Sequence, residues 1–179
     1  MEKAEIQSLI RAAFEGQKFA YVPYSRFHVG AALLGKNGTV YKGCNIENAG
    51  YTPTNCAERT ALFKAVSEGE REFAAIAIVG SKVGEKNTLV TGPCGVCRQA
   101  LFEFGGPGLT VIMAKSEDDY IVTTLGELLP YGFGPANLNL RQHRTIPACR
   151  LKHRSSGCGT PSALQKCSRI HKVFSALFA

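Results

Sequence analysis

A chain of 179 residues, 45% of them apolar, suits one globular domain, and no apolar run approaches the roughly 18 residues of a membrane span. The formal net charge of +7 divides into −1 for residues 1–137 (13 Lys and Arg, 14 Asp and Glu) and +8 for residues 138–179 (8 Lys and Arg, no acid). The basic charge therefore lies at the C-terminal end, and it gives no reason to expect a nucleic-acid substrate for residues 1–137.

The first part of the chain predicts a helix and a β-hairpin. Apolar residues at helical spacing in the opening segment predict an amphipathic helix that ends near Phe19. Two short apolar runs, residues 29–34 and 39–44, flank Asn37-Gly38, which is a strong signal for a hairpin turn. We therefore expect two antiparallel strands in this region.

Three helices and three strands are expected in the rest of residues 1–137. One helix begins at Cys56, with Asn55 as its N-cap and Glu58 as the capping-box partner. Pro93 opens a second helix that ends at Gly105-Gly106. With a last short helix, the order is α-β-β-α-β-α-β-β-α, which predicts a three-layer α/β fold. The remaining strands are expected at residues 73–79, 110–113 and 120–124.

Residues 138–179 lack the pattern of a packed domain. They contain scattered Arg, Ser, Gly and Pro, and no sustained apolar period precedes residues 173–178. We therefore divide the chain into a folded catalytic domain, residues 1–137, and a basic tail, residues 138–179, which we expect to be disordered. An RNA-binding or zinc-binding module is the alternative for the tail, with candidate ligands Cys149, His153, Cys158, Cys167 and His171.

The seven cysteines come without a secretory signal, which favours metal chemistry in a cytoplasmic protein over a disulfide scaffold. Cys94 and Cys97 lie three residues apart at a predicted helix start, so one turn presents both sulfurs on one side. Cys56 lies at a second helix start, where positive potential favours the thiolate. Three ligands leave a fourth tetrahedral position for water, which is typical of a catalytic zinc site. Glu58 can reach the same pocket without binding the metal.

Structural alternatives stay open for these motifs. A lone C-x-x-C is more often half of a structural zinc site or a redox pair. A structural site would need a fourth Cys or His, for which residues 1–137 offer only Cys44 and His28. We interpret Cys44 as a small buried residue and His28 as a surface or hydrogen-bonded histidine.

Five motifs resemble, in order and spacing, those of the cytidine deaminase family in its small homotetrameric form with three cysteine ligands. The resemblance covers about residues 4–137. It implies a three-layer α-β-α fold with a mixed five-stranded sheet. It also implies zinc-dependent hydrolysis of cytidine and 2'-deoxycytidine to the corresponding uridines and ammonia, a reaction of pyrimidine salvage. The motifs are YSRFHVGAA at 24–32, GCNIEN at 43–48, CAERTA at 56–61, PCGVCRQ at 93–99 and ELLP at 127–130.

The resemblance implies roles for residues of the metal site. Cys56, Cys94 and Cys97 would bind Zn²⁺, and Glu58 would move protons to N3 of cytosine and to the departing amine. Three thiolates and one Zn²⁺ leave a net charge of −1. Arg59 would offset this charge by hydrogen bonds to the sulfurs, with a solvated helix Arg as the alternative.

The substrate contacts are implied by the same resemblance. Asn45 and Glu47 would bind the ribose hydroxyls, although capping of a loop turn remains an alternative for both. Phe27 would line the nucleoside pocket, and the backbone around Ala57 would hold the base carbonyl. Phe133 would stack on the base in a neighbouring subunit's active site, so the resemblance implies a homotetramer.

Gly50 and Gly92 depart from the usual family pattern, and both add flexibility near the pocket without removing a ligand. Among related enzymes, blasticidin-S deaminase shares the zinc chemistry but is not expected to carry Asn-Ile-Glu-Asn at the sugar site. Nucleotide, tRNA-adenosine and polynucleotide deaminases typically have His where this chain has Cys56. We therefore expect a nucleoside substrate and no nucleic-acid or membrane partner for residues 1–137.

Overall fold

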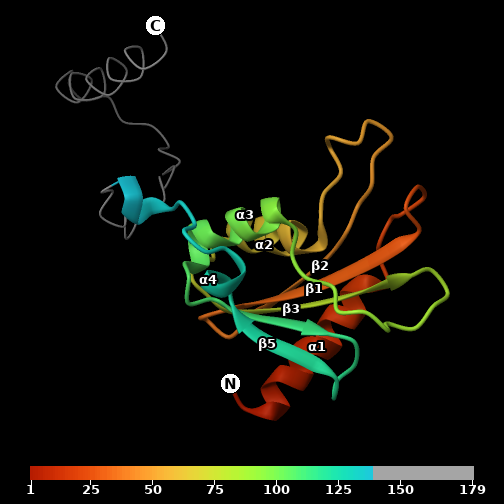
Figure 1. Cartoon of the computed structure of the whole chain (residues 1–179), viewed down its shortest axis with the longest axis horizontal. Coiled ribbons are helices and arrows are strands. Elements are labelled where there is room, and N and C mark those ends of the chain that lie inside the picture. Colours follow the sequence, from red (N-terminus) through yellow and green to blue (C-terminus); the bar gives the residue numbers. More distant parts are fainter. Residues whose placement is uncertain (139–179) are drawn as a thin grey trace, which may run out of the picture. The chain divides into compact units, whose positions relative to one another are not determined.

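The computed structural model describes residues 1–138, so the expectations for residues 139–179 lie outside the described residues. The helices and strands follow the order expected from the sequence, with a 3₁₀ helix added at the end (Figure 1). The helices are α1 Lys3–Gln17, α2 Ala57–Ser67, α3 Gly95–Gly105, α4 Leu125–Leu128 and the 3₁₀ helix η1 Pro135–Leu138. The strands are β1 Phe27–Gly35, β2 Val40–Cys44, β3 Phe73–Lys82, β4 Thr110–Ala114 and β5 Tyr120–Thr124.

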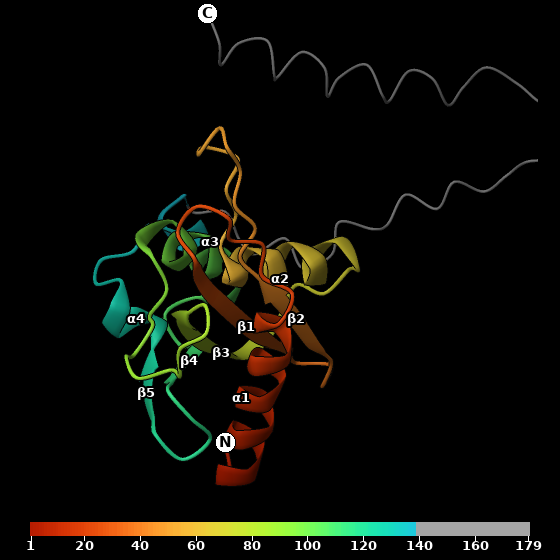
Figure 2. The same cartoon turned by 90° about the vertical axis from the view of Figure 1, so that its right-hand side faces the viewer.

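The five strands form one mixed sheet in the order β2-β1-β3-β4-β5. β3 and β4 are parallel, and the other neighbouring pairs are antiparallel. α1 covers one face of the sheet, and α2 and α3 cover the other (Figures 1 and 2). The expected three-layer fold with a mixed five-stranded sheet is therefore confirmed. Among the described residues, no helix has both the length and the apolar composition needed to cross a membrane.

The central strands contribute to two cores because successive side chains of a strand point to opposite faces. β3 is buried on both faces for most of its length, and it extends three residues beyond the predicted end at Val79. The core under α1 includes Leu9, Ile10, Ala32, Ala75, Ala77 and Val79. The core under α2 and α3 includes Leu33, Leu62, Ile76, Ile78 and Leu101.

Gly43 of β2 allows α2 to lie close to the sheet. A Cβ atom added at Gly43 would collide with the Ala57 carbonyl, and it would lie 2.5 Å from the Ala61 nitrogen. A larger residue would therefore push away the first turn of α2. The glycine thus sets the position of Cys56, which directly precedes that turn.

The helix starts differ in detail from the expectation. Cys56, and not Asn55, is the N-cap of α2, and its side chain makes no capping hydrogen bond. Asn55 Nδ2 donates instead to Thr60 Oγ1 at 3.1 Å. α3 begins at Gly95, two residues after Pro93. The capping-box prediction was wrong because the sequence pattern does not distinguish which of two adjacent residues adopts the extended N-cap conformation, here Cys56 at φ −76° and ψ 155°.

Candidate metal centre and active site

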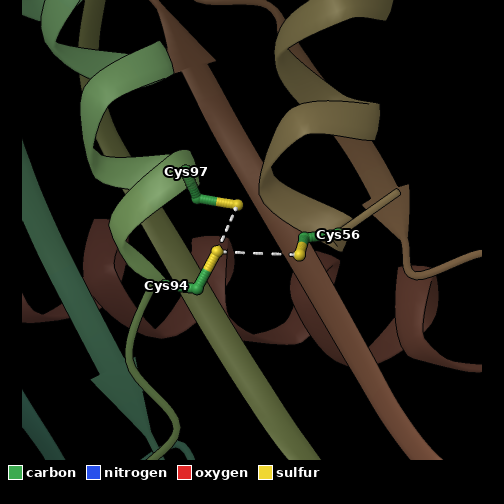
Figure 3. A group of neighbouring side chains, drawn as sticks. All are labelled: Cys56, Cys94 and Cys97. Carbon is green, nitrogen blue, oxygen red and sulfur yellow. Dashed lines mark hydrogen bonds between the residues drawn. The ribbon is translucent and has the colours of Figure 1, made fainter. Parts of the chain in front are cut away.

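Three cysteine sulfurs meet between the N-terminal ends of α2 and α3 (Figure 3). Cys56 and Cys94 are the N-caps of α2 and α3, and Cys97 lies in the first turn of α3. The Sγ atoms of Cys94 and Cys97 are 3.5 Å apart, and those of Cys56 and Cys94 are 3.9 Å apart. The structure thus brings together the three residues that the sequence predicted as metal ligands.

The sulfur positions fit a zinc ion. Zn–S bonds of about 2.3 Å place the ligand atoms of a tetrahedral site about 3.8 Å apart. Two of the observed separations, 3.5 and 3.9 Å, are close to that value, and all three sulfurs lie within 4.8 Å of one another. Among the described residues, this cluster contains no fourth Cys or His. A set of three protein ligands is typical of a catalytic zinc site, where a water molecule takes the fourth position.

Cys44 and His28, the spare candidates for a fourth ligand, lie elsewhere. The Cys44 thiol donates to the Phe19 carbonyl at 3.3 Å. His28 lines an open surface depression of about 410 Å³ together with Tyr21 and Arg26. Although this depression is larger than the cavity beside the cysteines, it contains none of the residues predicted for the reaction, and the chemistry favours the smaller cavity.

Arg59 lies beside the metal ligands and affects their charge. Its Nη2 atom donates to the Thr54 carbonyl at 3.3 Å and to Cys56 Sγ at 3.9 Å. The neighbouring Cys97 thiol and the Arg59 guanidinium lower the pKa of the Cys56 thiol to about 5. Interaction with Cys56, together with burial, raises the pKa of the Cys97 thiol. Binding of a cation such as Zn²⁺ would favour the thiolate form of Cys97.

Glu58 is the one charged side chain that is buried among the described residues, with 3% of its surface exposed. It lies in the first turn of α2 and lines the same cavity as Cys56 and Cys94. Burial raises the pKa of the Glu58 carboxyl to about 7. A carboxyl group in this range is suited to both accepting and releasing a proton near neutral pH.

The cavity beside the cysteines has a volume of about 190 Å³. Five of its lining residues were predicted to bind the metal or the substrate or to catalyse the reaction, and five others were not predicted to do so. Four of these five directly precede the two cysteine motifs, so extending each motif by two residues would have found them. The predicted lining residues are Asn45, Glu47, Cys56, Glu58 and Cys94, and the others are Val29, Thr54, Asn55, Thr91 and Gly92.

The Asn45 amide is bonded to the backbone of β1. Its Oδ1 atom accepts a hydrogen bond from the Val29 N–H at 2.8 Å, and its Nδ2 atom donates to the Phe27 carbonyl at 2.9 Å. An amide group offers two donors and two acceptor lone pairs, so one donor and one lone pair remain. Asn45 therefore supports a loop and keeps the capacity to bind a hydroxyl group.

The Glu47 carboxylate supports the loop that precedes β1. Its Oε2 atom accepts hydrogen bonds from the backbone N–H groups of Tyr24 and Ser25 at 2.9 and 3.2 Å. Hydrogen bonding, first from the Ser25 side chain, lowers the pKa of the Glu47 carboxyl. Glu47 therefore brings a negative charge to the lining of the cavity, with Oε1 left as an acceptor.

Three predicted substrate contacts do not line this cavity. Phe27 lies close to the lining residue Thr91, because both contact Gly80. A Cβ atom added at Gly80 would lie 2.6 Å from Thr91 Oγ1 and 3.0 Å from Phe27 Cε1. Ala57 is buried at the first position of α2, where its backbone N–H has no acceptor within the helix. Phe133 is 57% exposed. Of the expected contacts, the ring of Phe133 is the one displayed on the surface.

Comparison with known proteins agrees with the chemistry of the cysteine cluster. Residues 3–114 match the sequence model of the cytidine and deoxycytidylate deaminase zinc-binding region. The chain is 46% identical over 135 residues to a cytidine deaminase of Sporosarcina psychrophila, covering 75% of this chain and 96% of that protein. It is 48% identical over 133 residues to a cytidine deaminase of Halalkalibacterium halodurans, covering 74% and 97%.

The fold resembles that of solved structures with the same chemistry. A crystal structure of cytidine deaminase from Burkholderia pseudomallei matches with a TM-score of 0.64 at 48% identity, covering 70% of this chain and 97% of that one. A cytidine deaminase structure from Mycobacterium tuberculosis matches with a TM-score of 0.61 at 41% identity, covering 71% and 95%. The family match over residues 3–114 includes both cysteine-bearing helix starts.

Proposed function

The chain belongs to the cytidine and deoxycytidylate deaminase family, and from this premise we propose which of its residues perform the reaction. The chain is a zinc-dependent enzyme that hydrolyses cytidine to uridine and ammonia, and the same reaction converts 2'-deoxycytidine to 2'-deoxyuridine. The observation that supports the site assignment best is the meeting of three cysteine sulfurs beside one buried carboxyl group.

Cys56, Cys94 and Cys97 hold the zinc ion. Zinc, when bound, supplies Lewis acidity that makes water a nucleophile at neutral pH. Glu58 would take one proton from the attacking water and deliver it to N3 of cytosine. It would then take the second proton from the same oxygen, now bonded to C4, and deliver it to the amine, which leaves as ammonia while the C4 carbonyl of uridine forms. The protons balance, because one water molecule and cytidine give uridine and ammonia.

Arg59 adjusts the charge of this site. The charges of three thiolates and one Zn²⁺ sum to −1, and this negative charge opposes nucleophilic attack on the substrate. The hydrogen bond from Arg59 Nη2 to Cys56 Sγ, at 3.9 Å, draws electron density from the sulfur and offsets this charge. The hydrogen bond to the Thr54 carbonyl keeps the guanidinium in place, whereas a solvated Arg would lack such a bond.

The cavity favours a nucleoside over a nucleotide. Its lining, as far as the structure describes it, contains no Lys, Arg or His, and it carries the carboxyl groups of Glu47 and Glu58. A 5'-phosphate would meet negative charge without a cation to pair with it. Asn45 and Glu47 have free hydrogen-bonding positions that suit the ribose hydroxyls, and these residues also support the neighbouring loops.

Phe27, Ala57 and Phe133 complete the substrate contacts in this proposal. Phe27 lies beside the lining residue Thr91, and the Ala57 N–H at the start of α2 is free to meet the base carbonyl. Phe133 presents an exposed ring, which suits stacking on a base in a neighbouring subunit. We therefore assign a homotetramer, in which each pocket is completed by an adjacent chain.

We assign the catalytic domain to residues 1–137, with residues 138–179 as a separate basic tail that has no part in the chemistry. The 3₁₀ helix η1 ends at Leu138, the last described residue. The reaction suits pyrimidine salvage in the cytoplasm, where free nucleosides are the substrate. A related cytosine nucleoside such as blasticidin S is the second candidate substrate.

A turnover assay with four substrates tests the proposal. The fall in ultraviolet absorbance that accompanies deamination is followed for cytidine, 2'-deoxycytidine, deoxycytidylate and blasticidin S, with zinc content measured on the same sample. We expect turnover of the first two and little or none of the other two. Faster turnover of deoxycytidylate than of deoxycytidine would overturn the argument from the charge of the cavity.

A further inference from the structure

The segment that bears Phe133 rests on α3, the helix that carries Cys97. Phe133 lies between Gly132 and Gly134, and both glycines pack on the ring of Phe102. A Cβ atom added at Gly132 would lie 2.9 Å from Phe102 Cε2, and one added at Gly134 would lie 2.9 Å from Phe102 Cε1. Such separations are closer than carbon atoms pack in protein interiors, so the contact leaves no space for a side chain.

Packing, and not backbone conformation, accounts for both glycines. Neither Gly132 nor Gly134 has a positive φ, in contrast to Gly106 at φ 61°. Gly134 is also buried, and its N–H donates to Asn137 Oδ1 at 2.8 Å. The two glycines that flank Phe133 therefore pack directly on the Phe102 ring, and they can do so because they have no side chains.

Hydrogen bonds from α3 hold the same segment at both ends. Gln99 Nε2 donates to the Phe133 carbonyl at 2.8 Å. The preceding residue, Arg98, donates from Nη1 to the Leu128 carbonyl at 2.7 Å and from Nε to the Pro93 carbonyl at 2.7 Å. Two consecutive residues of α3 therefore fix both ends of the 128–133 segment, and one of them also holds the residue before Cys94.

The Phe133 ring is 57% exposed although its backbone is held at three points. An exposed aromatic ring on a fixed backbone loses little conformational entropy when it contacts a ligand. A freely moving loop would pay that entropy on each binding event. The arrangement is therefore suited to presenting the ring in one orientation.

We propose that Phe102 and Gln99 are positioning residues that fix the Phe133 ring for contact with the bound nucleoside. This inference rests on the proposed role of Phe133 in substrate binding. It assigns two functions to α3, because its first turn carries metal ligands and its following turns orient the aromatic contact. The positioning residues act on substrate affinity through Phe133 and leave the metal site unchanged.

The main test is Gly134→Ala, which places a methyl group against the Phe102 ring. The matched control is Gly108→Ala, because an added Cβ there meets no atom within 4 Å. For Gly134→Ala we expect KM for cytidine to rise about 3- to 10-fold, part of the effect of losing base stacking, with kcat and zinc content unchanged. Adding Phe102→Leu, which makes space for the methyl group, should restore part of the affinity.

A milder variant, Gln99→Glu, keeps the shape of the side chain and removes the donor to the Phe133 carbonyl. We expect a smaller rise in KM, of about 2- to 5-fold, because this hydrogen bond is exposed. Oligomer mass by light scattering and melting temperature are measured for each variant. Unchanged KM in both Gly134→Ala and Gln99→Glu, with folded tetramers, would overturn the proposal.

Double variants with Phe133→Ala identify the route of the effect. If Gly134→Ala and Gln99→Glu act through Phe133, neither raises KM further once the ring is removed. Full additivity would overturn the positioning role even if Phe133 binds the substrate. If Phe133→Ala alone leaves KM unchanged, the proposed function of Phe133 fails, and this inference fails with it.

Discussion

The side-chain amide of Asn45 donates to the backbone carbonyl of Phe27 at 2.9 Å, so one hydrogen bond joins a predicted sugar contact to a residue predicted to line the nucleoside pocket. A second bond, from the Val29 N–H to Asn45 Oδ1, fixes the amide against β1. The two interpretations of Asn45, ribose binding and loop support, are therefore compatible in one side chain.

Asn45→Ala should consequently affect stability and binding together. We expect the free energy of unfolding to fall by about 1–3 kcal/mol, because partly buried backbone groups of Phe27 and Val29 lose their partners. We also expect KM for cytidine to rise at least about 10-fold. Denaturant unfolding and steady-state kinetics measure the two effects. A stability loss with normal KM would leave loop support as the whole role of Asn45.

Removing one sulfur should abolish the metal site. Purified protein is expected to hold about one zinc ion per chain, and Cys94→Ala should lose both zinc and activity, because two thiolates make a much weaker site. Elemental analysis and the cytidine assay measure these outcomes. The control is Cys44→Ala, since the Cys44 thiol lies outside the cluster and bonds the Phe19 carbonyl. Full activity in metal-free Cys94→Ala protein would disprove the assignment.

Glu58→Gln keeps the size of the buried side chain and removes its capacity to carry a proton. We expect kcat to drop by about 10²- to 10⁴-fold, the usual contribution of general acid-base catalysis, with zinc retained. Glu68→Gln is the matched control, because Glu68 is exposed at the other end of the same helix. A near-normal rate in zinc-loaded Glu58→Gln protein would mean that another group moves the protons.

The sequence predicts the metal centre well because its geometry is local. The spacing of Cys94 and Cys97 determines their separation within one helical turn, and the structure places their sulfurs 3.5 Å apart. The position of Cys56 next to them depends on the tertiary fold. The sequence indicated it through the resemblance and through the place of Cys56 at a predicted helix start, where positive potential favours the thiolate, and not through spacing alone.

Contacts between distant segments are the features of the fold and of the site that could not be predicted from the sequence. The packing of Gly134 on Phe102 joins residues that are 32 positions apart, and no local pattern encodes it. Thr91, a lining residue of the cavity, contacts Gly80 of β3, and its Oγ1 atom donates to the Gly80 carbonyl at 3.4 Å. The choice of Cys56 over Asn55 as N-cap likewise depends on where α2 meets the sheet, which Gly43 controls.

Truncation after residue 138 tests the domain division. Residues 1–138 contain the whole sheet, the three metal ligands and the segment that holds Phe133, and their net charge is −1, against +8 for residues 139–179. An acid-free basic segment with no sustained apolar period before residues 173–178 offers little continuous apolar area to compete with a packed subunit interface.

We therefore expect the truncated protein to keep its zinc content, its oligomer state by light scattering and, within about twofold, its cytidine turnover. Removal of a group or interface that contributes to folding or binding would change these values by a larger factor. Salt-dependent binding of RNA by the full chain, absent from the truncated protein, would assign the basic residues a separate role, because contacts to phosphate weaken as salt rises. Loss of both the tetramer and the turnover on truncation would show instead that residues 139–179 belong to the folded enzyme and that the boundary at residue 137 is wrong.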